Sequence, residues 1–212
     1  MPSRGNSRPP AGLFGVLGLL AVRPMSTYEL ATHFDRSLGR MWPRTRSKLF
    51  EMPKRLVEMG FARAAKGATG RRAKTVYTIT PKGRRALAAW LAEPGGGPVI
   101  EFEALMKVFY GDQGGRDAMI ANLEAAKDWA REQIDEHIEV ARTYLEGRGA
   151  FQDRAAINQI TGRFHVELAL TVHRWATRSL ATVRTWPADP REAEMSRAAL
   201  EDVLRELEVA RE

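Results

Sequence analysis

The chain has 212 residues, of which 44% are hydrophobic and none is cysteine. This length allows one large domain or two small ones, and the composition supplies enough apolar side chains for a folded core. The absence of cysteine excludes a disulfide framework, a thiolate metal site and a cysteine nucleophile. The longest apolar run, Leu13 to Val22, has ten residues and falls short of the ~20 that span a bilayer. These features favour a cytoplasmic protein without membrane contact.

The N-terminal stretch combines a basic start with a short apolar segment, as secretory leaders do. No A-x-A site follows it, and Arg23-Pro24 come next. We therefore interpret residues 1–11 as a disordered basic tail that precedes a buried first helix.

The charge is divided unevenly along the chain. Residues 1–92 carry 18 Lys and Arg against 4 Asp and Glu, a net charge of +14, whereas residues 93–212 carry 15 against 22, a net charge of −7. The switch coincides with the Gly- and Pro-rich segment 93–98, which no helix crosses. We therefore predict a domain at 12–92 that suits a polyanion, a linker at 93–98, and a second domain at 99–212.

The first domain opens with signals for three helices. The apolar run predicts a helix at 13–22. A capping box, Ser26-x-x-Glu29, starts a second helix at about 27–34. Trp42-Pro43 predicts the start of a third helix with Pro at its first position, and Gly60 stands where a C-terminal cap belongs.

Two strands and a fourth helix complete this domain. We expect strands at 61–66 and 74–79, separated by the Gly-rich basic loop GATGRRA. Thr80 caps a helix that begins at Pro81 and ends near Ala92. Three helices followed by a β-hairpin predict a winged helix-turn-helix.

The second domain is predicted to be almost entirely helical. Apolar residues recur at helical spacing over 118–146, 156–185 and 190–210. Three long amphipathic helices have more apolar surface than one small domain covers. The sequence therefore predicts a mainly α protein whose C-terminal long helices form a dimerisation domain.

Several motifs in this order resemble the PadR-type transcriptional regulators: GVLGLL, MSTYEL, KRLVEMGF, the GRR loop and TVYTITPKGRRAL. The run P-x-x-E-F-E-x-L-M-K-V-F-Y-G-D resembles the C-terminal domain of the virulence-activator branch. The resemblance covers nearly all of residues 13–207. It implies a winged-helix regulator, and since some relatives bind aromatic compounds or drugs near the dimer seam, it also implies an effector site.

This sequence departs from the family pattern at three places. Ser26-Thr27 replace the frequent His-Gly, Phe50-Glu51 replace the common Tyr-Pro, and Pro53 falls inside the third helix. Two arrangements remain open there: a helix that continues with a kink at Pro53, or a helix that starts later, near Ser47.

DNA recognition by a helix requires base-reading and phosphate-binding side chains near its outward N-terminal end. The third helix supplies Arg and Lys for guanine or phosphate and Ser and Thr for either. The wing has the composition of a hairpin that contacts phosphate or the minor groove. The predicted DNA-binding residues are Arg44, Thr45, Arg46, Ser47, Lys48, Lys54, Arg55, Lys66, Arg71, Arg72 and Lys74. Lys82 at the start of the fourth helix opposes the helix dipole, which is consistent with a nearby polyanion.

Nothing in the sequence favours catalysis, a cofactor or a metal. There is no phosphate-binding loop or nucleophile elbow, and the four histidines have no clustered Asp or Glu ligands. We interpret the aromatic residues of the second domain as core or as an effector pocket: Trp129, Tyr144, Trp175 and Trp186.

The resulting hypothesis is a homodimeric, sequence-specific DNA-binding transcriptional regulator that is not an enzyme. Its partners would be double-stranded DNA with a pseudo-palindromic operator, a second copy of the chain and a small aromatic effector. Repression is favoured over activation, because excluding the polymerase requires only occupancy of the site. Two alternatives remain: a module that binds RNA or DNA without sequence choice, and a ligand-binding helical protein with an incidental basic half.

Overall fold

The computed structural model describes residues 9–37, 39, 42, 45–69 and 72–211. Contacts divide the chain into two compact units, Met1–Pro98 and Val99–Glu212. The tail expected at 1–11 lies mostly outside the described residues, and Ala11 already belongs to the first helix.

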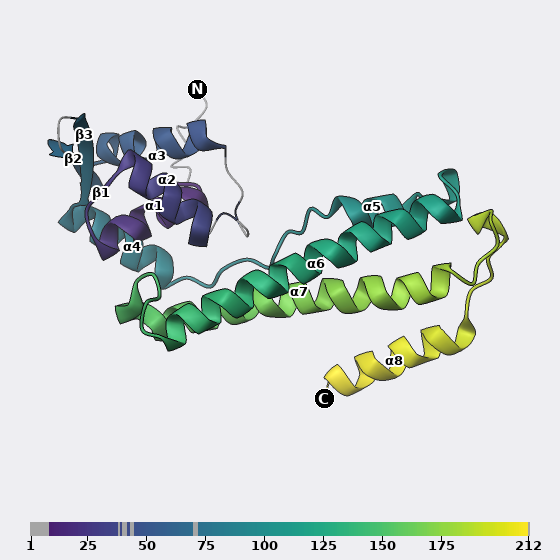
Figure 1. Ribbon diagram of the computed structural model, residues 1–212. Helices are drawn as coiled ribbons and strands as arrows, with labels where there is room; N and C mark the ends of the chain where they lie inside the picture. The colour runs from purple at the N-terminus through teal and green to yellow at the C-terminus, as the bar shows by residue number, and fades with distance from the viewer. Residues whose placement is uncertain (1–8, 38, 40–41, 43–44, 70–71, 212) are drawn as a thin grey trace, which may run out of the picture. The chain divides into compact units, whose positions relative to one another are not determined.

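The first unit combines helices with a small antiparallel sheet of strand order β1-β3-β2 (Figure 1). Its helices and hairpin follow the predicted order, and the mainly helical winged-helix fold class is confirmed. The elements are α1 (Ala11–Val22), β1 (Met25–Ser26), α2 (Thr27–Ser37), α3 (Arg46–Glu58), β2 (Ala62–Thr69), β3 (Arg72–Ile79) and α4 (Pro81–Leu91).

Helix α1 is the core helix of this unit. It contains no charged side chain, so each of its faces can be buried against protein. It contacts α2, α3, α4 and β3, and Leu17 and Leu20 are almost fully buried. Phe14 stacks on Trp90 of α4 with ring centroids 5.0 Å apart. The long apolar run is thus explained by the interior of the domain.

The predicted capping box forms at the start of α2. The backbone N–H of Ser26 donates to Glu29 Oε2 at 2.8 Å, and the N–H of Glu29 donates to Ser26 Oγ at 3.3 Å. Met25 and Leu30 are both buried beside it. Met25 and Ser26 also pair with Tyr77 and Val76 of β3. This short strand was not predicted, because two residues are too few to show the alternation of apolar and polar residues that is typical of a strand.

Helix α3 starts later than Trp42-Pro43, so that part of the prediction is wrong. Its N-cap is Thr45, whose hydroxyl accepts from the N–H of Lys48 at 3.5 Å. Thr is a preferred N-cap residue. The helix continues past Pro53 to Glu58. A late start and an interior proline, weighed as alternatives, therefore occur together.

The wing ladder is longer than predicted. Pairing of β2 with β3 extends through Lys66↔Thr75 and Gly67↔Lys74 to Thr69↔Arg72. The segment GATGRRA is therefore mostly strand rather than loop, and only residues 70–71 connect the two strands. Gly and Ala lower strand propensity when read locally, but the ladder hydrogen bonds outweigh that preference here.

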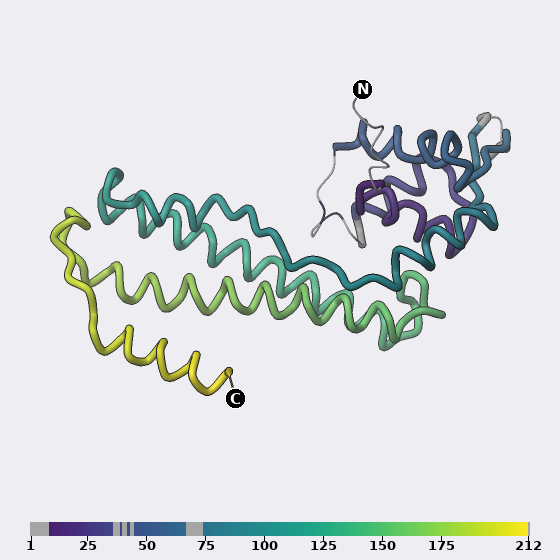
Figure 2. The backbone as a smooth tube through the Cα atoms, turned by 180° about the vertical axis from the view of Figure 1, so that it is seen from behind, coloured from purple at the N-terminus to yellow at the C-terminus, as the bar shows by residue number. Residues whose placement is uncertain are grey.

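The second unit is built from helices (Figures 1 and 2). Its long helices α6 and α7 run antiparallel, with α5 beside the N-terminal part of α6. The elements are α5 (Glu103–Phe109), the 3-10 helix η1 (Gly111–Gln113), α6 (Arg116–Leu145), η2 (Gln152–Arg154), α7 (Ala155–Val183), η3 (Pro190–Glu192) and α8 (Arg197–Arg211). Helix α5 was not predicted as an element of its own, and the last helix was predicted to begin too early, at 190.

The seam between α6 and α7 is closed by small residues. Ala126 and Ala130 of α6 and Ala169 and Ala176 of α7 are all buried, so the two backbones can approach closely. Larger side chains, among them Leu123 and Leu180, fill the seam nearer the α6 N-terminus. Toward the C-terminal end of α6 and the N-terminal end of α7, the apolar residues that were predicted to form stripes are largely exposed, among them Leu145 and Ile160.

The turn between α6 and α7 leaves little spare room. The hydroxyl of Tyr144 donates to the carbonyl of Ala150, and Asn158 Nδ2 donates to that hydroxyl at 2.9 Å. A Cβ on Gly149 would lie 2.3 Å from the Tyr144 ring. Phe151 has a φ of 54°, which is strained for a bulky residue. Side-chain contacts therefore fix the conformation of this turn.

Within the described residues, no helix is long and apolar enough to cross a membrane.

Candidate nucleic-acid interface

Helix α3 has a buried face and an exposed face. Leu49, Pro53 and Leu56 point into the first unit and are buried. Ser47, Glu51, Lys54 and Glu58, which follow one another at helical spacing, lie on the opposite face and are exposed. The core thus holds α3 from one side and leaves the other side for a partner.

The first turn of α3 presents the central predicted contacts. Arg46, Ser47 and Lys48 occupy the first three helical positions and are exposed. Thr45 is exposed and packs its hydroxyl 3.1 Å from Ser47 Oγ, so these hydroxyls also organise the helix start. Arg44 lies outside the described residues. Three of the five predicted contacts therefore share one turn, with Thr45 as their cap.

The electrostatics of this turn are unusual for a helix start. It contains no acidic side chain, and Arg46 and Lys48 carry positive charge. Cations at this end oppose the helix dipole, whereas an anion there is stabilised by both the cations and the unpaired N–H groups. The arrangement is suited to binding an anion such as a phosphate.

Further along α3, Lys54 and Arg55 are exposed, at a greater distance from the helix start than the first-turn residues. Glu51, which is not among the predicted contacts, lies one turn after Ser47 on the same exposed face. A carboxylate can accept from cytosine N4 and repels phosphate. Once the helix register was known, the position of Glu51 opposite the buried face of α3 would have identified it as a candidate contact.

The wing separates its cations between two faces. Directly paired residues share a face and neighbours along a strand alternate, so the pairs Lys66↔Thr75 and Gly67↔Lys74 place Lys66 and Lys74 on opposite sides. Lys66 is exposed and Lys74 is half-buried. Arg71 lies outside the described residues, and of Arg72 only the backbone, in β3, is described.

The positive charge of Lys74 already acts on a carboxylate of its own domain, that of Glu29. The hydroxyl and the backbone N–H of Ser26 lower the pKa of Glu29 from 4.5 to about 2, and the positive charge of Lys74 and a hydrogen bond from Arg23 contribute further. Among the predicted wing contacts, Lys66 is therefore the side chain with more freedom to reach a partner.

The predicted aromatic pocket is not assembled within one chain. Trp175 and Trp186 pack against one cluster with Met119, Leu123, Leu180 and Val183. Trp175 also meets Phe102 edge-on, with centroids 5.6 Å apart. Trp129 is 43% exposed on α6, and Tyr144 belongs to the turn at the far end of that helix. Of these four aromatic residues, Trp175 and Trp186 thus pack against the same cluster.

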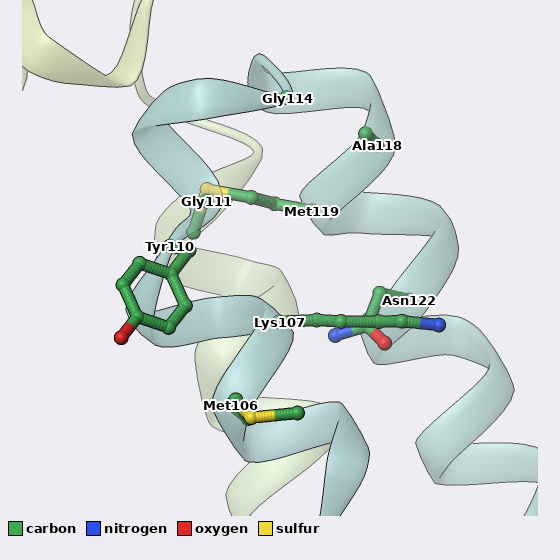
Figure 3. Close-up of a pocket in the computed structure, with 8 residues that line it drawn as sticks. All are labelled: Met106, Lys107, Tyr110, Gly111, Gly114, Ala118, Met119 and Asn122. Carbon is green, nitrogen blue, oxygen red and sulfur yellow. The ribbon is translucent and has the colours of Figure 1, made fainter.

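An open groove of about 470 Å³ lies where α5 and η1 meet α6 (Figure 3). Met119 reaches from α6 to Gly111, where a Cβ would approach its sulfur to 2.4 Å. Lys107 pairs with Glu103 at 2.8 Å, and Asn122 Nδ2 donates to the carbonyl of Ala104 at 2.9 Å. The groove therefore presents mainly methionine and tyrosine side chains.

The histidines do not form a metal site in the part of the chain that is described, where no group of three or more His, Asp or Glu could hold an ion. His137 and His165 do face each other across α6 and α7, with ring centroids 6.0 Å apart.

Two family models match the chain. The model described as "Transcriptional regulator PadR-like family" matches residues 16–89, and "Virulence activator alpha C-term" matches residues 102–184. The first match spans α1 to α4, including α3 and the wing, and the second spans α5 to α7.

Two curated relatives support the first match. The chain is 38% identical over 80 residues to a probable transcriptional regulator of Mycobacterium tuberculosis, covering 37% of this chain and 42% of that protein. It is 27% identical over 99 residues to the negative transcriptional regulator PadR of Bacillus subtilis, covering 46% and 54% respectively. The matched region thus spans about half the length of these relatives.

Solved structures share the fold over most of the chain. Bacillus subtilis PadR in complex with operator DNA matches with a TM-score of 0.72 at 19% identity, covering 82% of this chain and 99% of that one. The same regulator in complex with p-coumaric acid matches with a TM-score of 0.65 at 20% identity, covering 81% and 97%. Residues 16–89 thus match the PadR-like family of transcriptional regulators, residues 102–184 match the C-terminal domain of virulence activators, and the solved structures share the fold.

Proposed function

We propose that this protein is a homodimeric transcriptional regulator that binds a pseudo-palindromic operator in double-stranded DNA. The observation that carries this proposal is the first turn of α3, where exposed Arg46, Ser47 and Lys48 stand opposite a face anchored in the core. A related fold has been solved with operator DNA. A regulator of this kind binds DNA and is not an enzyme, and it acts in the compartment that holds the DNA, which we take to be the cytoplasm.

The contacts divide by role. We assign base reading to Arg44, Arg46 and Lys48, because Arg pairs bidentately with guanine and the start of a recognition helix enters the major groove. Thr45 and Ser47 serve bases or phosphates. Lys54, Arg55 and the wing residues Lys66, Arg71, Arg72 and Lys74 contact the phosphate backbone, with Lys74 the weakest of these.

Dimerisation is proposed to use the apolar residues that one chain leaves exposed. Leu200, Val203, Leu204 and Leu207 form a stripe along α8, every described residue of which is exposed. Ile157 and Ile160 of α7 are exposed as well. An isolated helix of this length is marginal in water, so a second copy that covers the stripe explains its formation.

One relative bears on repression and on a response to an effector. A relative is named a negative regulator, and one of its structures holds p-coumaric acid. We propose that this chain likewise represses and responds to a small aromatic compound. Trp175 and Trp186 are the aromatic residues best placed for it, because they already share a cluster; Trp129 and Tyr144 would join only through a second chain.

The test compares an operator with random DNA. Sequence selection from random DNA supplies the operator, and fluorescence anisotropy at one salt concentration measures both affinities. We expect the wild type to prefer the operator by at least ~10³-fold. Arg46→Ala should remove about 1–3 kcal/mol of that discrimination, whereas Arg85→Ala, an exposed cation on α4, should not. Equal binding of both DNAs by the wild type would favour the non-specific alternative.

A further inference from the structure

Helix α3 ends in a motif that leaves two carbonyls for outside donors. Gly60 has a φ of 73°. The N–H groups of Gly60 and Phe61 donate to the carbonyls of Val57 and Leu56, each at 2.8 Å. These two bonds form the Schellman arrangement, and neither of them uses the carbonyls of Met59 and Gly60.

The first turn of α4 supplies the missing donors. Lys82 Nζ donates to the carbonyl of Met59 at 2.9 Å. The hydroxyl of Thr80 donates to the carbonyl of Gly60 at 2.7 Å, and the N–H of Thr80 donates to the carbonyl of Phe61 at 2.9 Å. Three consecutive carbonyls directly after α3 are thus bound by two residues.

Helix α4 is also in close steric contact with the segment that follows α3. A Cβ on Gly83 would lie 2.1 Å from the carbonyl oxygen of Phe61, so only glycine fits there. The Gly83 N–H donates to the Thr80 hydroxyl at 3.0 Å. The same hydroxyl therefore starts α4 and holds the end of α3.

The charge of Lys82 suits α3 better than α4. At the start of α4 a cation opposes the helix dipole, but at the C-terminal end of α3 it is favourable. The ammonium also lies 5.6 Å from the centroid of the Phe61 ring, within reach of a cation–π interaction. A nearby polyanion is not needed to explain this charge.

We propose that Lys82 and Thr80 are positioning residues that set the direction of α3, and that they act on DNA recognition without contacting DNA. This inference rests on the proposed role of α3 as the recognition helix. A helix of 13 residues is about 20 Å long, so a tilt of about 5° about its C-terminal end moves Arg46 by about 2 Å. Hydrogen bonds to base edges do not tolerate such a shift.

The first test measures DNA binding by variants that remove each donor. Lys82→Met keeps the alkyl chain and loses the ammonium, and Thr80→Val loses the hydroxyl. We expect each to reduce the ratio of operator to random-DNA affinity about tenfold and to leave the salt dependence unchanged. Lys82→Arg and Thr80→Ser, which keep the donors, should restore the ratio. Thermal melts identify temperatures at which each variant is fully folded.

A phosphate contact would give a different result. In that case Lys82→Met lowers both affinities equally and reduces the salt slope by about one, which overturns the proposal. So does an unchanged ratio in both donor-less variants.

The second test needs no DNA and therefore separates this inference from the proposed function. Amide hydrogen exchange should become faster at Gly60 and Phe61 in Lys82→Met, whereas Lys82→Arg retains the wild-type protection. Unchanged protection of the Gly60 and Phe61 amides overturns the proposed role of Lys82, even if the wild type selects an operator. If the wild type shows no preference for an operator, the proposed function is refuted. The exchange experiment then still decides whether Lys82 holds the end of α3.

Discussion

The two units of this chain differ in how completely one copy buries its apolar side chains. In the first unit, α1 is enclosed by α2, α3, α4 and β3, and the large apolar residues of its core are buried. In the second unit, Ile160 is 76% exposed and Leu207 62% exposed. The basic unit is closed by a single chain, whereas the acidic one exposes the kind of surface that association covers. In the proposed function, DNA binding and assembly are therefore separate tasks of separate units.

The strongest test of this difference charges the apolar stripe of α8. Leu204→Lys combined with Leu207→Lys should convert the proposed dimer to a monomer, because two ammonium groups cannot be buried in an apolar interface. Operator affinity should fall by about a hundredfold or more, since two linked half-sites are lost. Light scattering gives the mass and anisotropy the affinity. Asp202→Lys, a similar charge change on the other face of α8, is the control, and a tightly binding monomer would contradict the proposed assembly.

Separating the units should leave the first one folded. A fragment of residues 1–98 is expected to melt cooperatively and to remain monomeric, because its core is complete within one chain. It should keep weak binding to DNA but lose most of the affinity of the full-length protein. Circular dichroism and light scattering check the two properties. A fragment that is unfolded, or one that dimerises, would remove the contrast between the units.

The wing offers a finer comparison within the first unit. Lys66→Ala should weaken binding to operator and random DNA alike, by about threefold to tenfold, and flatten the salt slope by about one. Lys74→Ala should have a smaller effect, because this half-buried lysine already interacts with Glu29. Anisotropy titrations at several salt concentrations measure both. Equal slopes for the two variants would show that the faces of the wing are not distinguished by DNA.

The smallest expected effect concerns acid stability. The pKa of Glu29 is about 2 in the folded chain against 4.5 for the free side chain. A lowered pKa means that the stability it contributes is present above pH 4.5 and is lost as the pH falls toward 2. Glu29→Gln should therefore cost about 1 kcal/mol near neutral pH, as loss of a capping interaction does, and less in acid. Urea unfolding at pH 7 and pH 3 measures the difference; an equal cost at both would rule out this role.

Strong local signals in the sequence were sufficient to predict much of the fold. The capping box at Ser26, the C-terminal Gly60 and the Thr80-Pro81 helix start each fix backbone geometry with neighbouring residues, so they can be recognised in the sequence. The start of α3 was misread because Trp42-Pro43 and Thr45 are both acceptable signals three residues apart. Strand β1 depends on pairing with distant Tyr77, which no local pattern reveals.

The candidate site was predictable to a similar degree. The residue types of the first turn of α3 were identified from composition and order, but Glu51 was not, because its exposure follows from the helix register. The roles of Lys82 and Lys74 were also beyond sequence reasoning. Lys82 donates to a carbonyl of the first unit and the charge of Lys74 acts on Glu29, and a lysine that interacts with its own chain looks the same in sequence as one that binds phosphate.

The tight turn between α6 and α7 has a consequence for how related chains can vary in length. Gly149 has no room for a side chain, and the backbone of Ala150 is bound by Tyr144. An inserted residue would break these contacts and shift one long helix past the other. We therefore expect insertions and deletions among homologues to be rare at this turn and to accumulate between α7 and α8, where residues 184–196 form a longer connection.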